Sequence, residues 1–496
     1  MTVPQIPVCG SIPFPPVVAP AWRPTTDSTF HAEKSSLAGT SKNRRPNALH
    51  GCWHGECGLQ AAADAAGGPD PEEGLPPVEH GRPFQTRRRR EMKAMLKLGA
   101  LAVAAVLAPA GGAAAAGAIS DGVVRIGVLN DRSGIYADMA GEGSAVAARM
   151  AAEQFKNKVA GAPIEIIVAD HQNKVDVGAS IARKWYDSDG VDLITDITNS
   201  GVSLAINALM KDNNKLFLNN SASGALSGKG CAPRAVQWQY SAYSASAHAV
   251  SKEMIDSGMN TFFVIAVDYA LGKSITATFT NAVESMGGKV VGVVNHPLNT
   301  GDMSSYVLQA QASGAKGILM ANAGSDLGNT VKAARDYGLV PGVTLIAAAL
   351  TTDVIDSFGF DVMQGVQMLS QFNMYRNDDA KAWVQEFIKR HGKSPTSLQA
   401  ATYSEVLWYL KAVDALGTDD AEKVMAWLKA QTINDVFADN GKVRADGLMS
   451  HDMYLVKVKA PGESKGPGDY FNVLQVLTGD QANIPLSQSD CPLVKK

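Results

Sequence analysis

The sequence predicts an α/β fold made of two lobes, each a doubly wound parallel sheet with helices on both faces. Three observations lead to this expectation. Short apolar runs alternate with segments of helical periodicity from residue 123 onward, which is typical of β–α–β units. The alternation restarts after residue 238, so two series of similar size follow one another. With 496 residues, the chain is long enough to bury two full cores.

The first series begins with the apolar run VVRIGVL over 123–129, a strand that is followed by a loop over 130–138. The later elements in chain order are helix 143–155, strand 164–169, helix 178–186, strand 191–197, helix 202–211, strand 215–218 and the short segment 236–240. Strands that are apolar throughout and separated by helices indicate a parallel sheet that is buried on both faces.

The second series repeats this pattern. Its elements are helix 245–256, strand 261–267, helix 273–286, strand 289–294, helix 306–312, strand 317–322, helix 328–337 and strand 344–348. Strand 366–371, helices 379–390, 397–416 and 421–431, and closing strands 452–457 and 471–476 come after them. We therefore expect the helical block to return to the first lobe and the closing strands to join the edge of the second sheet. The predicted boundaries are 119–238 plus 368–448 for the first lobe and 239–367 plus 449–496 for the second.

Residues 1–91 have the composition of a disordered extension, since they are rich in Pro, Gly and Ala and show no sustained period. The cluster of Cys52, His54 and Cys57 in this extension matches no common zinc spacing. We expect no metal and no cofactor.

Residues 92–118 resemble a secretory signal peptide. Lys93 and Lys97 precede an apolar run over 98–108, and a small-residue zone follows at 113–116. The apolar run is too short to span a bilayer. We therefore expect a start at Met92 or Met95, the preceding residues being an over-extended start, and a periplasmic location.

Charge and cysteine content exclude two classes of protein. From residue 119 onward Asp and Glu outnumber Lys and Arg by six, so the chain lacks the basic surface that nucleic acids require. Five Cys are too few and too scattered for a disulfide scaffold.

Small polar residues follow three strands of the first series. The loop over 131–138, with Ser133 and Tyr136, follows the first strand. Thr198, Asn199 and Ser200 follow the third, and the segment 219–224, with Asn220, Ser221, Ala222 and Ser223, follows the fourth. Ligands of open parallel sheets bind at the carboxyl ends of the strands, where hydroxyls and free N–H groups at a helix start favour a carboxylate. Each loop taken alone is more often a helix cap or a turn than a binding loop, because Ser and Asn are common in loops. Together the three loops indicate a binding cleft for a small anion.

The sequence contains no common catalytic signature. It has no Gly-x-Ser-x-Gly elbow, no His-Glu-x-x-His and no phosphate-binding loop that ends in Gly-Lys-Ser/Thr. The alternative to a binding protein is an exported α/β enzyme that acts on a small organic acid, with Asp131, Asp170 or Asp353 as the acid–base group. His171, beside Asp170, forms the one acid–base pair worth testing.

The sequence resembles the branched-chain amino-acid type of extracytoplasmic solute-binding proteins of ABC importers, a group of type I periplasmic binding proteins. The resemblance rests on the opening segment VRIGVLNDRSGIYADMAG after a signal peptide, and on DYALG at 268–272. It covers the chain from about residue 121 to its end. It implies two α/β lobes joined by a three-strand hinge, closing on a ligand that the protein delivers to a membrane permease as a monomer.

The resemblance also implies ligand contacts. In the first lobe these are Ser133, Tyr136, Asn199 or Ser200, and 221–223. In the second lobe they are Tyr269, Leu271 and the region from Asn322 to Asp326. Amino-acid binders of this type place an acid after a later strand to pair with the ligand ammonium, and here the nearest acid is Asp353.

The displaced acid bears on the ligand, because a desolvated ammonium without a partner is costly. The expected ligand is therefore a small carboxylate, either a branched-chain amino acid or an aromatic or aliphatic organic acid. Leu271, Tyr136 and Trp238 are candidate apolar walls. Two Cys remain beyond the signal peptide, Cys231 and Cys491, and an oxidising periplasm favours a disulfide over two free thiols.

Overall fold

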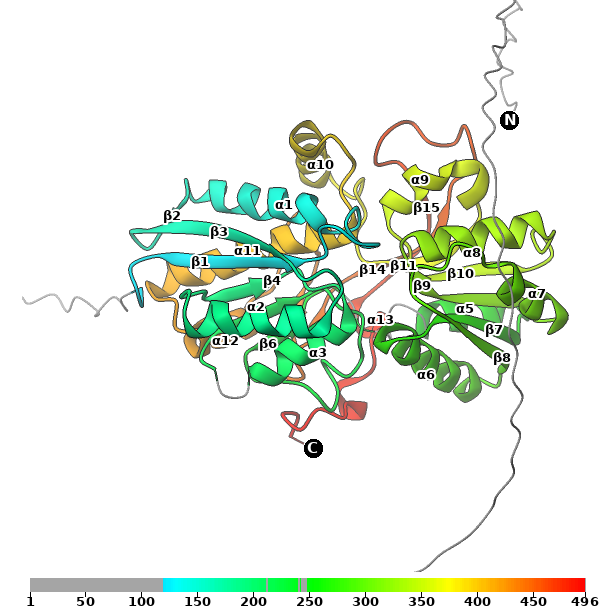
Figure 1. Ribbon diagram of the computed structural model, residues 1–496, viewed down its shortest axis with the longest axis horizontal. Coiled ribbons are helices and arrows are strands. Elements are labelled where there is room, and N and C mark those ends of the chain that lie inside the picture. The colour runs from blue at the N-terminus through cyan, green and yellow to red at the C-terminus, as the bar shows by residue number, and fades with distance from the viewer. Residues whose placement is uncertain (1–118, 211–212, 240, 242–247, 496) are drawn as a thin grey trace, which may run out of the picture. The chain divides into compact units, whose positions relative to one another are not determined.

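The chain forms two lobes of sheet and helix (Figure 1). The computed structural model describes residues 119–495 apart from 211–212, 240 and 242–247, and all described residues belong to one unit. This confirms the predicted two-lobed α/β fold.

Three features of the sequence analysis lie outside the described residues: the extension over 1–91, the signal peptide over 92–118, and the Cys52, His54 and Cys57 cluster. Among the described residues, no group of three or more His, Cys, Asp or Glu side chains is arranged to hold a metal ion. In the same part of the chain, no helix has both the length and the apolar character needed to cross a bilayer.

The first lobe is built on a six-stranded sheet with the order β2-β3-β1-β4-β5-β6. Its strands are β1 (Val124–Asn130), β2 (Lys158–Val159), β3 (Ala162–Asp170), β4 (Leu193–Thr195), β5 (Leu216–Asn219) and β6 (Ala235–Gln237). All pairs are parallel except the β2–β3 hairpin, which the alternating pattern did not predict. β1 lies inside the sheet and is almost entirely buried, as a strand covered on both faces must be.

Helices cover both faces of this sheet. On one face α1 (Gly141–Gln154) packs against α11 (Ser397–Leu416), and on the other α2 (Val175–Asp187) packs against α3 (Ser200–Leu209). α10 (Asp378–His391) packs on α1, and α12 (Ala421–Ala430) packs on α11. The helical block therefore returns to the first lobe, as expected. α11 is buried along most of its length because it has neighbours on several sides.

The second lobe holds a seven-stranded sheet with the order β15-β14-β11-β10-β9-β7-β8. Its strands are β7 (Thr261–Val267), β8 (Lys289–His296), β9 (Gly317–Ala323), β10 (Thr344–Ala349), β11 (Gln367–Ser370), β14 (Met453–Val458) and β15 (Phe471–Leu477). β7 to β11 are parallel, whereas β14 and β15 are antiparallel. The closing strands thus extend the edge of the second sheet, as predicted, and make it a mixed sheet.

The helices of the second lobe are α5 (His248–Asp256), α6 (Ala270–Ser285), α7 (Ser304–Ala312), α8 (Ser325–Asp336) and α9 (Thr352–Met363). The sequence analysis did not predict α9. This helix is broken at Gly359, whose φ of 78° and ψ of 160° are not helical. The break interrupts the helical period of the sequence, which explains why the pattern is hard to recognise.

The chain passes between the lobes after β6, after β11, and between the short strand β13 (Met449–Ser450) and β14. β13 pairs with β12 (Lys442–Val443) in a small hairpin beside the first sheet. After β15 come α13 (Gly479–Ala482) and a short 3₁₀ helix, Leu486–Gln488. The tail then reaches the first lobe, where the expected disulfide joins Cys491 to Cys231.

Candidate functional site

A small cavity lies between the two lobes, where strands of both sheets end. It spans about 270 Å³. The first lobe contributes Tyr136, Met139, Thr198, Asn220 and Leu398, and the second contributes Tyr269, Leu271, Ala323 and Ala349. We call this space the cleft cavity. None of these lining residues is charged, so recognition in the cavity rests on hydroxyls, one amide and apolar surface.

The loop after β1 carries Tyr136 into the cleft cavity, and Asp131 holds the loop in shape. The Asp131 carboxylate accepts hydrogen bonds from the backbone N–H groups of Gly134, at 2.7 Å, and Tyr136, at 2.9 Å. It also accepts a close hydrogen bond from Asn173 Nδ2. Because the carboxylate serves these donors and does not line the cavity, Asp131 organises the loop.

The loop after β4 presents Thr198 to the cavity. The next residue, Asn199, is the N-cap of α3, and its Oδ1 accepts hydrogen bonds from the N–H groups of Gly201 and Val202. Such a cap fixes the start of the helix and the path of the loop before it. Thr198 is 8% exposed, and its Oγ1 is buried without a hydrogen-bond partner. Burying a hydroxyl without a hydrogen-bond partner costs about 1–3 kcal/mol of free energy.

Asn220 follows β5, and its side-chain amide has one defined orientation. Its Nδ2 lies 3.2 Å from Asp196 Oδ1, 3.3 Å from the Leu398 carbonyl and 3.1 Å from Thr402 Oγ1. Carboxylate and carbonyl oxygens only accept hydrogen bonds here, so the nitrogen must face them. The Oδ1 of Asn220 is therefore the atom on the other side, and it is buried without a partner. The first lobe thus offers the cavity an oriented acceptor.

Buried acids lie beneath this loop. Burial raises the pKa of Asp196 to about 6, although hydrogen bonds from Asn130 and Asn220 oppose that shift. Burial also raises the pKa of the neighbouring Glu405 carboxyl well above its ordinary value, and Thr195 Oγ1 forms a close hydrogen bond to it. Asp196 has a left-handed φ of 64°, an uncommon conformation for a residue other than glycine. The hydrogen bond between Asp196 and Asn220 Nδ2 helps to fix the orientation of the Asn220 side chain.

The second lobe contributes a mainly apolar wall. Leu271 lies in the first turn of α6, and Ala323 and Ala349 end β9 and β10. The polar exception is Tyr269, at the N-cap of α6, whose hydroxyl lies 2.8 Å from the Tyr136 hydroxyl of the first lobe.

The lobes touch at two further points around the cavity. The N–H of Gly224 donates to Ser274 Oγ at 3.0 Å. Gly324 in the second lobe has a φ of +60°, and a Cβ there would lie 3.1 Å from the carbonyl oxygen of Ile135 in the first. Glycine is required at this position both for the backbone conformation and for the close approach of the lobes. The lobes are therefore closed over the cavity.

Of the residues predicted to contact a ligand, Tyr136, Tyr269 and Leu271 line the cleft cavity. Several others support the loops around it. The Ser221 hydroxyl donates to Ser200 Oγ at 3.2 Å, and Ala222 packs in the core. The Ser223 carbonyl accepts from Gln237 Nε2.

Four predicted residues lie elsewhere. Ser133 is exposed, and its hydroxyl donates to Asp170 at 2.6 Å. Asn322 is fully buried in the second lobe, where its Nδ2 contacts His296 and Thr330. Asp353 lies in the first turn of α9 and lines none of the described cavities between the lobes. Trp238, a candidate apolar wall, is fully buried and donates to Ser404 Oγ.

Sequence reasoning did not single out Met139, Ala349 or Leu398, and it included Thr198, Asn220 and Ala323 only as members of the predicted loops. Thr198 and Asn220 each stand one position before a predicted residue, so the loops were identified but the facing side chains were not. Leu398 has no local signal, because α11 reaches the cavity only through the return of the chain to the first lobe.

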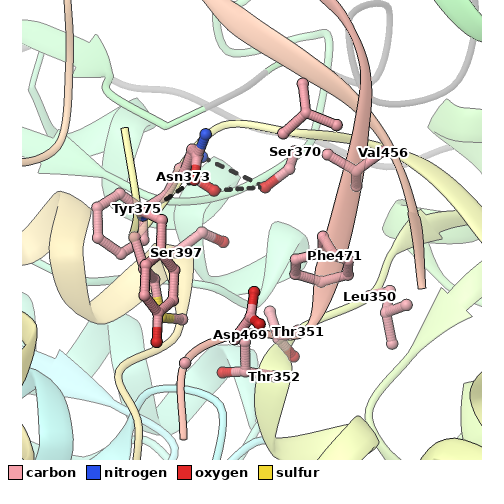
Figure 2. A pocket seen from close by; sticks show the side chains of 14 residues that line it. Leu350, Thr351, Thr352, Ser370, Asn373, Tyr375, Ser397, Val456, Asp469 and Phe471 are labelled. Atoms are coloured by element: carbon pink, nitrogen blue, oxygen red, sulfur yellow. Dashed lines mark hydrogen bonds between the residues drawn. The ribbon is translucent and has the colours of Figure 1, made fainter. Parts of the chain in front are cut away.

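A second, larger cavity lies near the hinge and spans about 680 Å³ (Figure 2). We call it the hinge cavity. A third pocket of about 230 Å³ lies between the two cavities. It shares Leu350, Thr351 and Ser397 with the hinge cavity, and Met139, Ala349 and Leu398 with the cleft cavity.

The residues named for the enzyme alternative have structural partners. Asp170 accepts hydrogen bonds from Ser133 Oγ and from the N–H of Arg132. His171 is buried, which lowers its pKa to about 4, and its Nδ1 accepts from the N–H of Asn173. Neither Asp170 nor His171 lines the cleft cavity.

Comparisons with known proteins agree with this architecture. Residues 123–466 match the family model described as periplasmic binding protein. The chain is 39% identical to a periplasmic binding protein from Burkholderia mallei, with a TM-score of 0.73, covering 76% of this chain and 100% of that one. A search of the curated proteins finds no match.

Two further solved structures are similar. One is a branched chain amino acid ABC transporter periplasmic ligand-binding protein from Burkholderia xenovorans LB400, 38% identical with a TM-score of 0.68, covering 75% of this chain and 99% of that one. The other is an amino acid ABC transporter substrate-binding protein from Pseudomonas fluorescens Pf-5, with 20% identity, a TM-score of 0.67 and coverage of 74% and 98%. The last likeness concerns the fold alone.

Proposed function

Because the chain belongs to the periplasmic binding protein family, we propose that it captures a small carboxylate between its lobes and delivers it unchanged to the membrane subunits of an ABC importer. The family implies an extracytoplasmic location. Export by the signal peptide over 92–118, action as a monomer and the absence of turnover are parts of the same proposal.

The observation that carries the proposal is a pair of buried polar atoms without partners, Thr198 Oγ1 and Asn220 Oδ1. Both residues line the cavity that the two lobes close upon. Buried polar groups in native proteins are nearly always hydrogen-bonded, so such a pair at one cavity supports a ligand that supplies the missing bonds.

The two atoms require different groups on the ligand, because a hydroxyl can donate a hydrogen bond whereas an amide oxygen only accepts one. The Thr198 hydroxyl can donate and so suits a carboxylate, which accepts hydrogen bonds. The Asn220 Oδ1 suits a donor on the same ligand. Since no carboxylate lines the cavity, an ammonium group would be buried there without a charged partner, which is costly. A hydroxyl meets the demand at lower cost.

We therefore infer that the preferred ligand is a small 2-hydroxy acid or a related organic acid. The alternative within the same function is a branched-chain amino acid, and the name of the Burkholderia xenovorans relative favours it.

The test is a series of ligands with one carbon skeleton. Leucine, 2-hydroxy-4-methylpentanoate and 4-methylpentanoate differ only in the substituent at C2, and benzoate adds an aromatic arm. We expect calorimetry to rank the hydroxy acid first, about tenfold above the plain acid, because one buried hydrogen bond is worth about 1–1.5 kcal/mol. Tightest binding of leucine would contradict the hydroxy-acid inference. Binding of none of the four would contradict the capture of small carboxylates.

Two controls sharpen this test. Asn220→Leu removes the acceptor and should abolish the difference between the hydroxy acid and the plain acid while both still bind. Mass analysis of the recovered ligand should show no product, whereas a product would favour the enzyme alternative.

A further inference from the structure

We propose that the hinge cavity is a second binding site, separate from the cleft cavity, and that it takes an uncharged, ring-bearing molecule with a hydroxyl group, such as a phenol. Its walls come from both lobes. Ser397 starts α11 of the first lobe, Leu350 to Thr352 lead into α9 of the second, and Phe471 belongs to β15 (Figure 2).

The site has an unmet polar group of its own. Thr351 is 5% exposed, lines the cavity, and has no hydrogen-bond partner for its Oγ1. Thr351 is also the N-cap residue of α9, yet its side chain makes no capping bond. A threonine at this position normally bonds the first turn of its helix. Here the hydroxyl remains available to a bound molecule, whereas the first turn of the helix is capped locally by the Asp353 carboxyl and the Thr351 carbonyl.

The other hydroxyls of the cavity have their bonds partly assigned. Thr352 Oγ1 donates to the Pro395 carbonyl at 3.0 Å, and Ser370 Oγ donates to the Phe372 carbonyl at 2.8 Å. Ser397 Oγ accepts from Gln239 Nε2 at 2.7 Å. Since a hydroxyl has one hydrogen and two lone pairs, Thr352 and Ser370 can only accept further bonds. They suit the hydroxyl hydrogen of a ligand.

Charge in the cavity is already neutralised. The one charged residue among those that line it is Asp469, whose carboxylate forms a close ion pair with Lys459 and accepts from the N–H of Lys465. An anion would therefore meet Asp469 with no free cation opposite it, and a cation would compete with Lys459. Burying an unpaired charge is costly, so the cavity favours an uncharged ligand.

The apolar lining suits a ring. Phe372, Tyr375 and Phe471 supply aromatic surface, and Leu350 and Val456 supply aliphatic surface. Figure 2 shows Tyr375 on one side of the cavity and Phe471, with Val456, on the other. A cavity with mostly apolar walls and a few convergent polar groups is the common form of a small-molecule site.

The experiment uses 4-fluorophenol as the probe and follows its binding to the full exported chain by fluorine NMR. Thr351→Val keeps the shape of the side chain and removes its hydroxyl, so we expect affinity for the probe to fall about fivefold to tenfold. Phe471→Ala should weaken it further. Val476→Ala, on the exposed side of the same strand, is the matched control and should change nothing.

Two further measurements distinguish this proposal from the proposed function. Thr198→Val changes the cleft cavity and should leave probe affinity unchanged; a loss there would place the probe in the cleft and overturn the second site. 4-Fluorobenzoate should bind the hinge cavity at least tenfold more weakly than 4-fluorophenol does. Equal binding would overturn the inference that the ligand is uncharged. Probe binding that is unchanged in both Thr351→Val and Phe471→Ala would overturn the proposal as a whole.

Discussion

The two walls of the cleft cavity differ in kind. The first lobe presents Thr198 and Asn220, whose positions are held by a helix cap and by hydrogen bonds to buried groups. The second lobe presents Leu271, Ala323 and Ala349, with Tyr269 as its polar contact. Under the proposed function, the first lobe recognises the ligand and the second covers it, a division that fits a hinged closure.

The two lobes also differ at their margins, in the covalent link of the tail and in the exposed edge of a sheet. The tail of the chain leaves the second lobe after α13, and its disulfide binds it to Cys231 of the first. The disulfide therefore joins the tail that leaves the second lobe to the first lobe over a sequence separation of 260 residues, whereas the free edge of the second sheet, β15, exposes Val473, Leu474 and Val476.

The largest expected effect is loss of the disulfide. Replacing Cys231 and Cys491 together by Ser should lower the free energy of unfolding by about 5 kcal/mol in the chain-entropy model, since the closed loop is long. Urea unfolding measures the change. Dithiothreitol should reproduce it in the wild type and have no effect on the double variant. An unchanged midpoint would mean that the link between the tail and the first lobe contributes nothing to stability.

The second effect concerns pH and the second lobe. Burial raises the pKa of Asp353 to about 6, above its usual value of about 3.9 in the unfolded chain. The folded state then holds the proton more tightly, so this group lowers stability as pH rises from about 4 to about 6. Asp353→Asn should be about 2–3 kcal/mol more stable than wild type at pH 7 and nearly equal to it at pH 4.

Chemical denaturation at the two pH values checks this expectation. Asp361→Asn, an exposed position on the same helix, is the control and should leave the wild-type pH dependence in place. If Asp353 were instead the partner of a ligand ammonium, Asp353→Asn would weaken the binding of leucine. A variant that keeps ligand affinity and gains stability only at neutral pH would support the placement of Asp353 outside the cleft cavity.

The smallest effects compare the two walls directly. Thr198→Val should weaken carboxylate binding about tenfold to 150-fold, because a hydrogen bond to a charged group is worth about 1.5–3 kcal/mol. Tyr269→Phe should weaken it less than about fivefold, since its hydroxyl has a neighbour in Tyr136. Calorimetry measures both, with Thr344→Val at the opposite end of β10 as the control. Equal losses would remove the distinction between a recognising and a covering lobe.

Much of the fold was predictable because its elements are long and periodic. The predicted helix over 397–416 coincides with α11, and the predicted strand over 317–322 with most of β9. The features that were missed are short or interrupted: the two-residue strand β2 and the broken helix α9. Local pattern carries little information at that length.

The site was less predictable for a different reason. Asn199 and Thr198 are adjacent polar residues in one loop, and only the path of the backbone decides that Asn199 caps α3 while Thr198 faces the cavity. Asn220 and Ser221 differ in the same way: one lines the cavity, and the other donates to Ser200.

The pattern of residues along the chain is enough to predict the two-lobed α/β class and the loops that approach the cleft, because hydrophobic period is a local property. It did not place every strand: the predicted lobe boundary at 367/368 cuts through β11, which belongs to the second sheet. Only the tertiary structure decided which atoms those loops present, how the amide of Asn220 is oriented, and that Leu398 and Ser397 reach the space between the lobes. These depend on contacts between segments up to about two hundred residues apart in the chain, such as that of Asn220 with Thr402, and no local pattern encodes them.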